Sequence, residues 1–338
     1  MHEVCVIGAG WAGLSAAFEL TAAGVDVVVL DKARGPGGRC STRRHGDFAF
    51  DHGGQYFTAR SEAFADAVRG WKQEGLVAAW RPRIRVFGRR PSNPGTTPAE
   101  RLVGVPGMNA VLKRLSARLD CRFGGRVEEL RRERNHWLVR RDRGDEILAR
   151  SVLLTAPPAQ AAELLAGRSE LAETASRVPM NPCWALMLGF DGPLDADFDA
   201  AFDNEGPLSW LARNSSKPGR SGEAWLLHAG PNWSRQHLEA DPDWVADQLL
   251  AAFHARIPSA AETTPALVSA HRWRYALAPA PLEQECLGEA RQRLVLAGDW
   301  CAGNRIEGAW VSGRAAAAQL LEWIGAVDGL HGEPDQPG

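Results

Sequence analysis

The chain has 338 residues, of which 45% are hydrophobic and 24% are charged, and its formal net charge at pH 7 is −2. This composition excludes an intrinsically disordered chain, and the near-neutral balance argues against a nucleic-acid partner, which requires a concentrated basic surface. The six cysteines form no C-x-x-C pair, so neither a disulfide framework nor a metal site is expected. The chain starts without a secretory signal, and no uncharged apolar run reaches the roughly 20 residues that cross a bilayer, so we expect a cytoplasmic protein without a membrane partner.

The N-terminal segment carries the strongest local pattern. An apolar strand at residues 4–7 is followed by G-x-G-x-x-G at Gly8, Gly10 and Gly13, then by an amphipathic helix and a second strand that ends in Asp31. In this motif the glycines permit a tight turn, a close approach to a pyrophosphate and close helix packing, and the acidic residue binds a ribose. The segment therefore predicts dinucleotide binding.

The residues after this unit favour a cofactor longer than NAD. A nicotinamide dehydrogenase normally continues into another βαβ unit, whereas this chain continues with K-A-R-G-P-G-G-R, which ends in Arg39, and with F-D-H-G-G-Q-Y-F-T at residues 50–58. Arg39 either offers a fork of donors to a phosphate or is a surface charge that closes the loop. The backbone from Gly53 to Tyr56 can pass close to a flat ring.

A later strand brings three aromatic side chains to one face. In S-A-H-R-W-R-Y-A-L at residues 269–277, strand alternation places His271, Trp273 and Tyr275 on one side and the two arginines on the other. These rings either pack between layers or line a pocket for a planar substrate, and both interpretations remain open.

Several segments together resemble a known family. They are G-P-G-G-R at 35–39, D-H-G-G-Q-Y-F-T at 51–58, G-V-P-G-M-N-A-V-L-K-R-L at 104–115, L-L-T-A-P-P-A-Q at 153–160, H-R-W-R-Y-A at 271–276 and L-A-G-D-W-C-A-G-N-R-I-E-G-A-W-V-S-G-R-A-A-A at 296–317. With the N-terminal motif, they resemble FAD-dependent oxidoreductases of the amine oxidase type and, within these, the renalase-like proteins.

The resemblance implies an α/β fold with a discontinuous Rossmann-like FAD-binding domain, similar to that of p-hydroxybenzoate hydroxylase, and a second α+β substrate domain. We expect the FAD-binding domain at residues 1–60, 101–158 and 288–326, with a small antiparallel meander at 125–150. The substrate domain is expected at 61–100 and 159–287, and a flexible tail at 327–338.

The resemblance also implies the cofactor contacts. Val127 is expected to hold the adenine, Ala156 to end near the cofactor and Asp299 to bind the ribityl-phosphate part, while Gly308 and Ala309 open a helix that faces the flavin. FAD is expected to bind non-covalently, with Cys301 as a buried structural thiol and not as a covalent anchor. The expected FAD-binding residues are Gly8, Gly10, Trp11, Ala12, Gly13, Asp31, Lys32, Gly38, Arg39, Gly54, Gln55, Tyr56, Phe57, Val127, Ala156, Gly298, Asp299, Glu307, Gly308 and Ala309.

Renalase-like proteins oxidise the 2-dihydro and 6-dihydro isomers of NAD(P)H to NAD(P)+ and reduce O2 to H2O2, so this is the activity that the resemblance implies. The sequence shows no metal-binding H-E-x-x-H and no G-x-S-x-G motif, and His52 is expected to be part of loop structure. No catalytic side chain is assigned, because the flavin N5 accepts the hydride and the protein mainly aligns the donor. The alternatives are another flavin oxidase or desaturase, acting on an amine, a porphyrinogen or a polyene, and a flavin-binding redox protein without turnover. The oligomeric state is left open.

Overall fold

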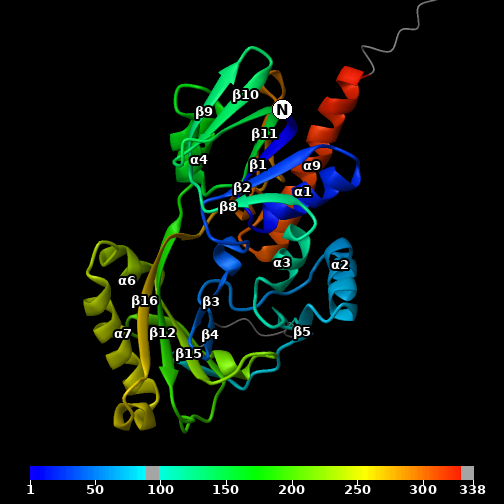
Figure 1. The fold of residues 1–338 in the computed structure, drawn as a ribbon. Coiled ribbons are helices and arrows are strands. Elements are labelled where there is room, and N and C mark those ends of the chain that lie inside the picture. The colour runs from blue at the N-terminus through cyan, green and yellow to red at the C-terminus, as the bar shows by residue number, and fades with distance from the viewer. Residues whose placement is uncertain (89–98, 329–338) are drawn as a thin grey trace, which may run out of the picture. The chain divides into compact units, whose positions relative to one another are not determined.

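The computed structural model describes residues 1–88 and 99–328, and the chain divides into two compact units. Unit 1 contains residues 1–38, 112–179 and the chain from residue 278 onward, and unit 2 contains residues 39–111 and 180–277. The predicted mixed α/β class is confirmed (Figure 1).

Unit 1 is built on an eight-stranded sheet in which β1 lies at the centre. The order is β17-β18-β11-β1-β2-β8, and β10 and β9 extend from β11 as an antiparallel meander. Neighbouring strands from β18 to β8 are parallel. The strands are β1 (His2–Ile7), β2 (Val27–Asp31), β8 (Asp120–Phe123), β9 (Val127–Glu133), β10 (His136–Arg141), β11 (Glu146–Leu154), β17 (Leu287–Glu289) and β18 (Leu294–Leu296).

Helices of unit 1 cover the sheet. Helices α1 and α9 lie side by side (Figure 1), and Gly313 permits this crossing because a Cβ there would come within 2.2 Å of the Ala12 carbonyl oxygen. The inner parallel strands carry buried apolar runs at residues 4–7, 27–30, 152–154 and 294–296, as expected for strands that are buried on both faces, whereas β8 at the edge includes Asp120 and Arg122. The helices are α1 (Trp11–Ala22), α4 (Pro158–Leu165), α5 (Leu171–Ser176), α8 (Asp299–Ala302) and α9 (Ile306–Asp328), while α3 (Ala110–Ser116) begins in unit 2 and ends in unit 1.

Unit 2 is built on a six-stranded sheet in the order β16-β12-β15-β14-β13-β6. All its pairs are antiparallel except β13 with β6. The strands of unit 2 are β3 (Thr42–His45), β4 (Phe48–Asp51), β5 (Val77–Ala79), β6 (Ile84–Phe87), β7 (Leu102–Gly104), β12 (Asn181–Phe190), β13 (Ala200–Asp203), β14 (Leu208–Arg213), β15 (Glu223–Ala229) and β16 (Leu267–Leu277). Its helices are α2 (Glu62–Gln73), α6 (Pro231–Gln236) and α7 (Pro242–Arg256).

The two faces of the unit 2 sheet bury different partners. Alternate residues of β12 divide between them, so that Trp184 and Leu186 pack with Phe253 of α7 while Met187 packs with Phe50 of β4. Figure 1 shows α6 and α7 on one side of β12 and β16. The face on the β4 side is the one that carries the candidate site residues of this unit.

The units differ from the expected domains in four segments. Residues 39–60 and 101–111 cluster with unit 2, because β4 packs on β15 and β7 pairs with β5. Residues 159–179 and 278–287 cluster with unit 1, because α4 packs on β9 and β17 pairs with β18. Of the expected tail, residues 327 and 328 belong to α9, and residues 329–338 lie outside the described residues.

Candidate functional site

The loop between β1 and α1 has the geometry that its glycines predict. Gly8 has φ +113°, and a Cβ there would lie 2.4 Å from the hydroxyl oxygen of Thr155. A Cβ on Gly13 would lie 1.9 Å from the carbonyl oxygen of Gly8. A side chain at Gly8 would collide with Thr155, and one at Gly13 would push α1 away from the loop, so both positions require glycine.

Gly10 differs from these two glycines, because a Cβ there would meet nothing within 4 Å. It is the N-cap of α1, whose first turn has no side-chain cap and no acidic residue. Trp11 and Ala12, the first helical residues, are buried. An open space beside an uncapped helix N-terminus fits a pyrophosphate group, which backbone N–H groups and the helix dipole would bind.

Asp31 ends β2 and bonds the backbone on both sides. Its Oδ2 accepts from the amide of Ala9 at 2.7 Å, and its Oδ1 accepts from the amide of Ala33 at 2.7 Å. Each carboxylate oxygen accepts more than one hydrogen bond. Asp31 therefore holds the motif loop and keeps capacity for a ribose hydroxyl.

The glycine-rich loop after β2 folds back onto the motif. Gly37 donates its amide to the carbonyl of Ala9 at 3.0 Å, and a Cβ on Gly38 would lie 3.6 Å from the Cα of Gly10. Burial, with a smaller contribution from Arg126, lowers the pKa of Lys32. The predicted adenine contact Val127 is buried at the start of β9.

The late strand–loop–helix segment follows β18, which runs parallel to β11 and β1, so its loop lies at the same carboxyl edge of the unit 1 sheet as the β1–α1 loop. Gly298 donates its amide to Ser312 Oγ at 2.8 Å, and Trp300 Nε1 donates to the carbonyl of Ala156 at 3.2 Å. Asp299 is buried at the start of α8. A Cβ on Gly308 would lie 2.0 Å from the carbonyl oxygen of Gly303, so this glycine lets α9 pack on the turn that precedes it.

One detail of the prediction for this segment is corrected. Helix α9 begins at Ile306 and not at Gly308, so Glu307, Gly308 and Ala309 all lie within its first turn. The turn after α8 ends at Asn304 and Arg305, and the Arg305 carbonyl accepts from Ala309 N, which starts the helical ladder earlier than the sequence suggested.

Cys301 is fully buried, and burial raises the pKa of its thiol far above its ordinary value. Because the thiolate is the reactive form of cysteine, this thiol is a poor nucleophile. The environment of Cys301 therefore agrees with non-covalent binding of the cofactor.

The remaining expected cofactor contacts, from Arg39 to Phe57, lie in unit 2. Gly53 passes so close to Arg39 that a Cβ would lie 2.0 Å from the Arg39 carbonyl oxygen, and the Gly54 amide donates to the same oxygen at 2.8 Å. The Arg39 guanidinium donates to the carbonyl of Ala276 at 3.1 Å, which ties this loop to β16.

Three consecutive side chains after Gly54 have different environments. The Gln55 amide is buried and donates to the carbonyls of Asp51 and Gly53. Tyr56 is half-buried and packs at a tilt on two tryptophans. Phe57 is buried against Phe64, so its side chain belongs to the core of unit 2.

His52, His271 and Trp273 pack ring against ring. The His52 ring stacks on Trp273 at 4.9 Å, and His271 meets both rings edge-on at 4.9 and 4.5 Å. Trp273 Nε1 and His228 Nε2 reach the His52 carbonyl at 2.8 and 3.2 Å. The loop at His52 is thus held by two side chains from the sheet.

Both imidazoles of this ring cluster are neutral at pH 7. The pKa of His52 is lowered to about 3, mainly because the ring is buried and further because His271 and Arg43 are nearby. Burial, then Arg43, lowers the pKa of His271 to about 4, and the Arg43 guanidinium lies 3.4 Å from His271 Nδ1.

The predicted alternation along β16 holds for His271 and Trp273, while Arg272 and Arg274 bond Glu239 on the opposite face. The pairing with β12 changes register beyond Trp273, so alternation no longer fixes the face of Tyr275, which is half-buried.

Sequence reasoning missed a buried ionic cluster. Asp51, Lys217 and Arg220 have side chains that are 0% exposed, and Lys217 Nζ and the Arg220 guanidinium both bond Asp51 Oδ2. The two cations come from N-S-S-K-P-G-R at residues 214–220, which reads as an exposed turn. The only signal was the short spacing of two cations just before a strand that is otherwise apolar.

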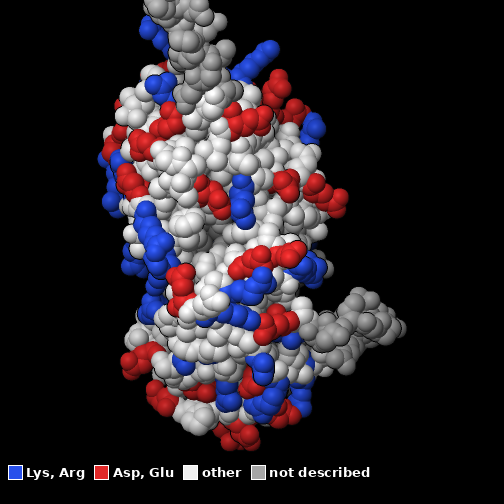
Figure 2. All heavy atoms as spheres, turned by 90° about the vertical axis from the view of Figure 1, so that its right-hand side faces the viewer, with Lys and Arg blue, Asp and Glu red and all other residues white. Residues whose placement is uncertain are grey.

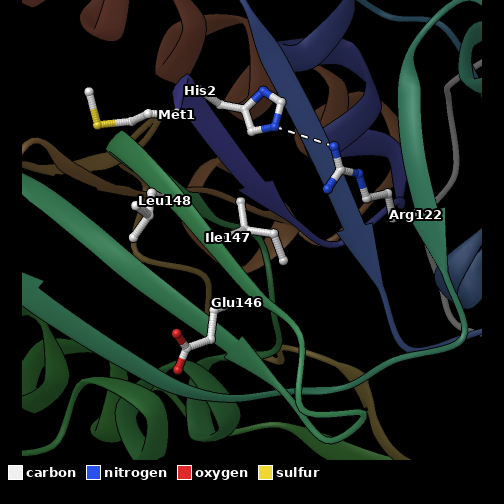
Figure 3. A pocket seen from close by; sticks show the side chains of 6 residues that line it. All are labelled: Met1, His2, Arg122, Glu146, Ile147 and Leu148. Carbon is white, nitrogen blue, oxygen red and sulfur yellow. Dashed lines mark hydrogen bonds between the residues drawn. The ribbon is translucent and has the colours of Figure 1, made fainter.

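A cavity of about 240 Å³ lies at the amino-terminal edge of β1, whereas the dinucleotide loop follows the carboxyl end of that strand (Figure 3). In Figure 3 a hydrogen bond of 3.3 Å joins His2 to Arg122 across it. Its lining is Met1, His2, Arg122, Glu146, Ile147 and Leu148. This cavity is therefore separate from the predicted cofactor site.

Lys and Arg side chains lie among Asp and Glu side chains on the face drawn in Figure 2, as the near-neutral net charge predicts. Within residues 1–88 and 99–328, no group of three His, Cys, Asp or Glu side chains is arranged to hold a metal ion. None of the described helices combines the length and the apolar character needed to cross a membrane.

Comparison with known proteins identifies the family. A family model described as "NAD(P)-binding Rossmann-like domain" matches residues 6–70, and one described as "Flavin containing amine oxidoreductase" matches residues 79–321. A putative protoporphyrinogen oxidase from Exiguobacterium sp. 255-15 has a similar structure, with TM-score 0.75 and 14% identity over 95% of this chain and 99% of that one. The cyclohexylamine oxidase of Brevibacterium oxydans IH-35A gives TM-score 0.74 and 15% identity over 96% and 99%.

Two curated relatives match short segments. Hydroxyneurosporene desaturase of Rubrivivax gelatinosus is 37% identical over 100 residues, which are 25% of this chain and 19% of that protein. The zeta-carotene-forming phytoene desaturase of Myxococcus xanthus is 46% identical over 52 residues, 15% of this chain and 10% of its own length. The matches thus span a fifth or less of the desaturases. On the extent of the family match, the chain belongs to the flavin-containing amine oxidoreductase family, and FAD is its cofactor.

Proposed function

We propose that this protein is an FAD-dependent oxidase that converts the 2-dihydro and 6-dihydro isomers of NAD(P)H to NAD(P)+ and reduces O2 to H2O2. The observation that carries the proposal is the packing of two neutral imidazoles and an indole, those of His52, His271 and Trp273, in unit 2. Flat rings of this kind suit a flat dihydropyridine ring.

The chemistry requires no side-chain base. A dihydropyridine that gives up a hydride becomes an aromatic pyridinium, so no proton has to leave its ring. Bound FAD would supply the hydride acceptor, its N5 atom, and the means by which two electrons and two protons reach O2 to give H2O2. The neutral state of His52 and His271 supports the proposal, because uncharged imidazoles do not repel a ring that becomes cationic.

A dinucleotide substrate also needs groups for its phosphates. Arg43, on β3, is half-buried and lies beside His271. A guanidinium next to a group of flat rings matches a ligand in which a flat base is linked to phosphate. Arg43 is therefore our candidate for the phosphate contact.

Anaerobic stopped-flow absorbance tests the proposal. Holoprotein is mixed with NADH that contains the 2-dihydro and 6-dihydro isomers, with isomer-free NADH, with cyclohexylamine and with protoporphyrinogen. We expect the flavin to bleach rapidly with the isomers alone. Bleaching by the amine or the porphyrinogen instead would support the corresponding alternative, and flavin that no donor reduces would favour a binding protein without turnover.

A pair of variants on one strand connects this reaction to the ring cluster. His271→Leu should slow bleaching by the isomers by about 10-fold or more while FAD stays bound, since a positioning contact is lost. Arg272→Met is the matched control, because Arg272 lies on the opposite face of β16 and bonds the carbonyl of Leu238 and the Glu239 carboxylate. Equal effects of the two variants would contradict the role of the ring cluster.

A further inference from the structure

The buried ionic cluster in unit 2 contains one more cation than its carboxylate needs. Arg220 already bonds Asp51 Oδ2 through Nε and Nη2, and its Nη1 donates to the carbonyls of Gly104 and Pro218. Asp51 also accepts from the Thr42 hydroxyl at 2.8 Å and the Met108 amide at 3.0 Å. The carboxylate is therefore neutralised and hydrogen-bonded without Lys217.

Burying a further charge is unfavourable. An ammonium group removed from water loses its hydration, and an apolar side chain of similar size in such a position is often neutral or stabilising. Burial accordingly lowers the pKa of Lys217 to about 8, against the opposing effect of Asp51. Packing alone does not account for a lysine at this position.

The contacts of Lys217 indicate what the lysine does. Its Nζ lies 3.0 Å from Asn214 Oδ1, 3.2 Å from Gln55 Oε1 and 3.4 Å from Asp51 Oδ2, so each of its three N–H groups has an acceptor. The ammonium also lies 5.4 Å from the centre of the Trp80 ring. Two of these acceptors, on Asp51 and Gln55, lie at the two ends of one short loop.

In that loop, residues 51–55, the backbone at Gly53 passes so close to Arg39 that a Cβ there would lie 2.0 Å from the Arg39 carbonyl oxygen. The Gln55 amide nitrogen reaches back to the carbonyls of Asp51 and Gly53, and Gln55 Oε1 accepts from Trp210 Nε1 at 3.3 Å as well as from Lys217. Lys217 thus links the side chains that begin and end the loop.

We propose that Lys217 is a positioning residue, which holds residues 51–55 in the conformation that presents the Gly53–Gly54 backbone to FAD. The inference rests on FAD as the cofactor and on this loop as a contact, and it is independent of the identity of the substrate. It assigns Lys217 no contact with FAD and no essential part in folding.

The protonation state of Lys217 gives the proposal a pH signature. Asp51, Arg220 and His228 are the titratable groups that face the ammonium, and His228 is neutral because burial lowers its pKa to about 4. Since the pKa of Lys217 is lower in the folded than in the unfolded chain, the unfolded chain binds more protons between pH 8 and 10.5. In that pH window Lys217 makes the free energy of unfolding rise with pH. Deprotonation of the ammonium also removes its charge from the contacts with Asp51 and Gln55, so the loop at residues 51–55 is held less tightly.

The test compares Lys217→Met with Lys72→Met, a matched control in which the lysine is partly exposed and paired with Glu100. We expect Lys217→Met to raise the dissociation constant of FAD by about 10-fold or more, which is the change expected when one hydrogen bond to a charged group is lost. FAD binding is measured by flavin fluorescence on titration of FAD-stripped protein. Urea unfolding of the stripped protein should give an unchanged or higher midpoint, without the rise in stability between pH 8 and 10.5.

A second variant, Lys217→Gln, keeps hydrogen-bond donors without the charge and should retain more FAD affinity than Lys217→Met. FAD affinity within twofold of wild type in both variants would overturn the proposal. So would a loss of affinity that merely follows a lower unfolding midpoint, or a failure of both variants to fold, because either result assigns the lysine to folding. Since no substrate is used, failure of the proposed oxidase activity leaves these outcomes unaffected.

Discussion

Two glycine-containing loops, residues 8–13 in unit 1 and residues 51–55 in unit 2, are held in place by different means. The first is fixed by groups of its own local motif: Gly8 and Gly13 allow atoms to approach more closely than any side chain permits, and the Asp31 carboxylate accepts from the Ala9 amide. The second is fixed by side chains that are far apart in sequence, among them Lys217 and Trp273. A loop of the first kind can be recognised from a local motif, whereas a loop of the second kind depends on tertiary packing.

We expect the largest effect on stability from a change to Asp51, the carboxylate at the centre of the ionic cluster that supports the unit 2 loop. Asp51→Asn keeps the shape of the side chain but leaves Lys217 and Arg220 buried without a counter-charge. We expect the free energy of unfolding to fall by about 3–5 kcal/mol, the usual effect of removing one partner of a buried ion pair. Urea denaturation followed by tryptophan fluorescence measures it.

Two further variants make this test specific. Asp197→Asn removes the partner of Arg85 in an exposed pair and should change the stability by less than about 0.5 kcal/mol. The double variant Asp51→Asn/Lys217→Met removes one of the two buried cations and should recover part of the loss. A double variant less stable than Asp51→Asn alone would show that the excess charge is not what destabilises the protein.

The unit 1 loop permits a test that separates ligand from fold. A methyl group at Gly10 meets no protein atom within 4 Å, so Gly10→Ala should leave the stability of FAD-stripped protein almost unchanged. The same methyl group would occupy the space assigned to the pyrophosphate, and we expect FAD affinity to fall by about 100-fold, as for a lost set of charge-assisted hydrogen bonds. Isothermal titration with FAD measures the change.

Gly13→Ala is the control for that variant, because its Cβ would lie 1.9 Å from the Gly8 carbonyl oxygen. It should impair folding itself, whether FAD is present or not. If Gly10→Ala bound FAD as tightly as wild type does, the pyrophosphate would not lie beside Gly10.

The same contrast between local motifs and tertiary packing explains which parts of the fold and of the site could be predicted from the sequence. The βαβ unit and the meander at 125–150 follow from local patterns, since strand and helix periodicity and the glycine spacing are contained in short windows, whereas the fold class was implied by the resemblance to FAD-dependent oxidoreductases. The face of His271 and Trp273 followed from alternation in β16, but the change of register near Asn181 put Tyr275 beyond the reach of that rule.

The ionic cluster was missed for a physical reason. Lys217 and Arg220 lie in a segment rich in Ser, Pro and Gly, and such a segment normally forms an exposed turn. Their burial depends on Asp51, more than 160 residues earlier in the chain. The contacts that place β4 in unit 2 are of a related kind, because β4 packs on β15 and no local signal predicts that packing.

The effect of acid pH on stability should be smaller than the effects of Asp51→Asn and Gly10→Ala. It also distinguishes the two loops, because only the unit 2 loop is bonded by His228. His228 is half-buried and donates to the carbonyl of His52, and removal of its ring from water lowers its pKa from 6.5 to about 4. Between these pH values the unfolded chain binds the extra proton, so stability falls as the pH falls. His228→Gln can keep the donor without the titration and should reduce the slope of unfolding free energy against pH by up to about 1.4 kcal/mol per pH unit. Because Gly10→Ala adds and removes no titratable group and leaves His228 in place, it should leave that slope at its wild-type value. An unchanged slope in His228→Gln would mean that this imidazole becomes protonated in the folded protein, and that the unit 2 loop is less tightly closed around His52 than its hydrogen bonds indicate.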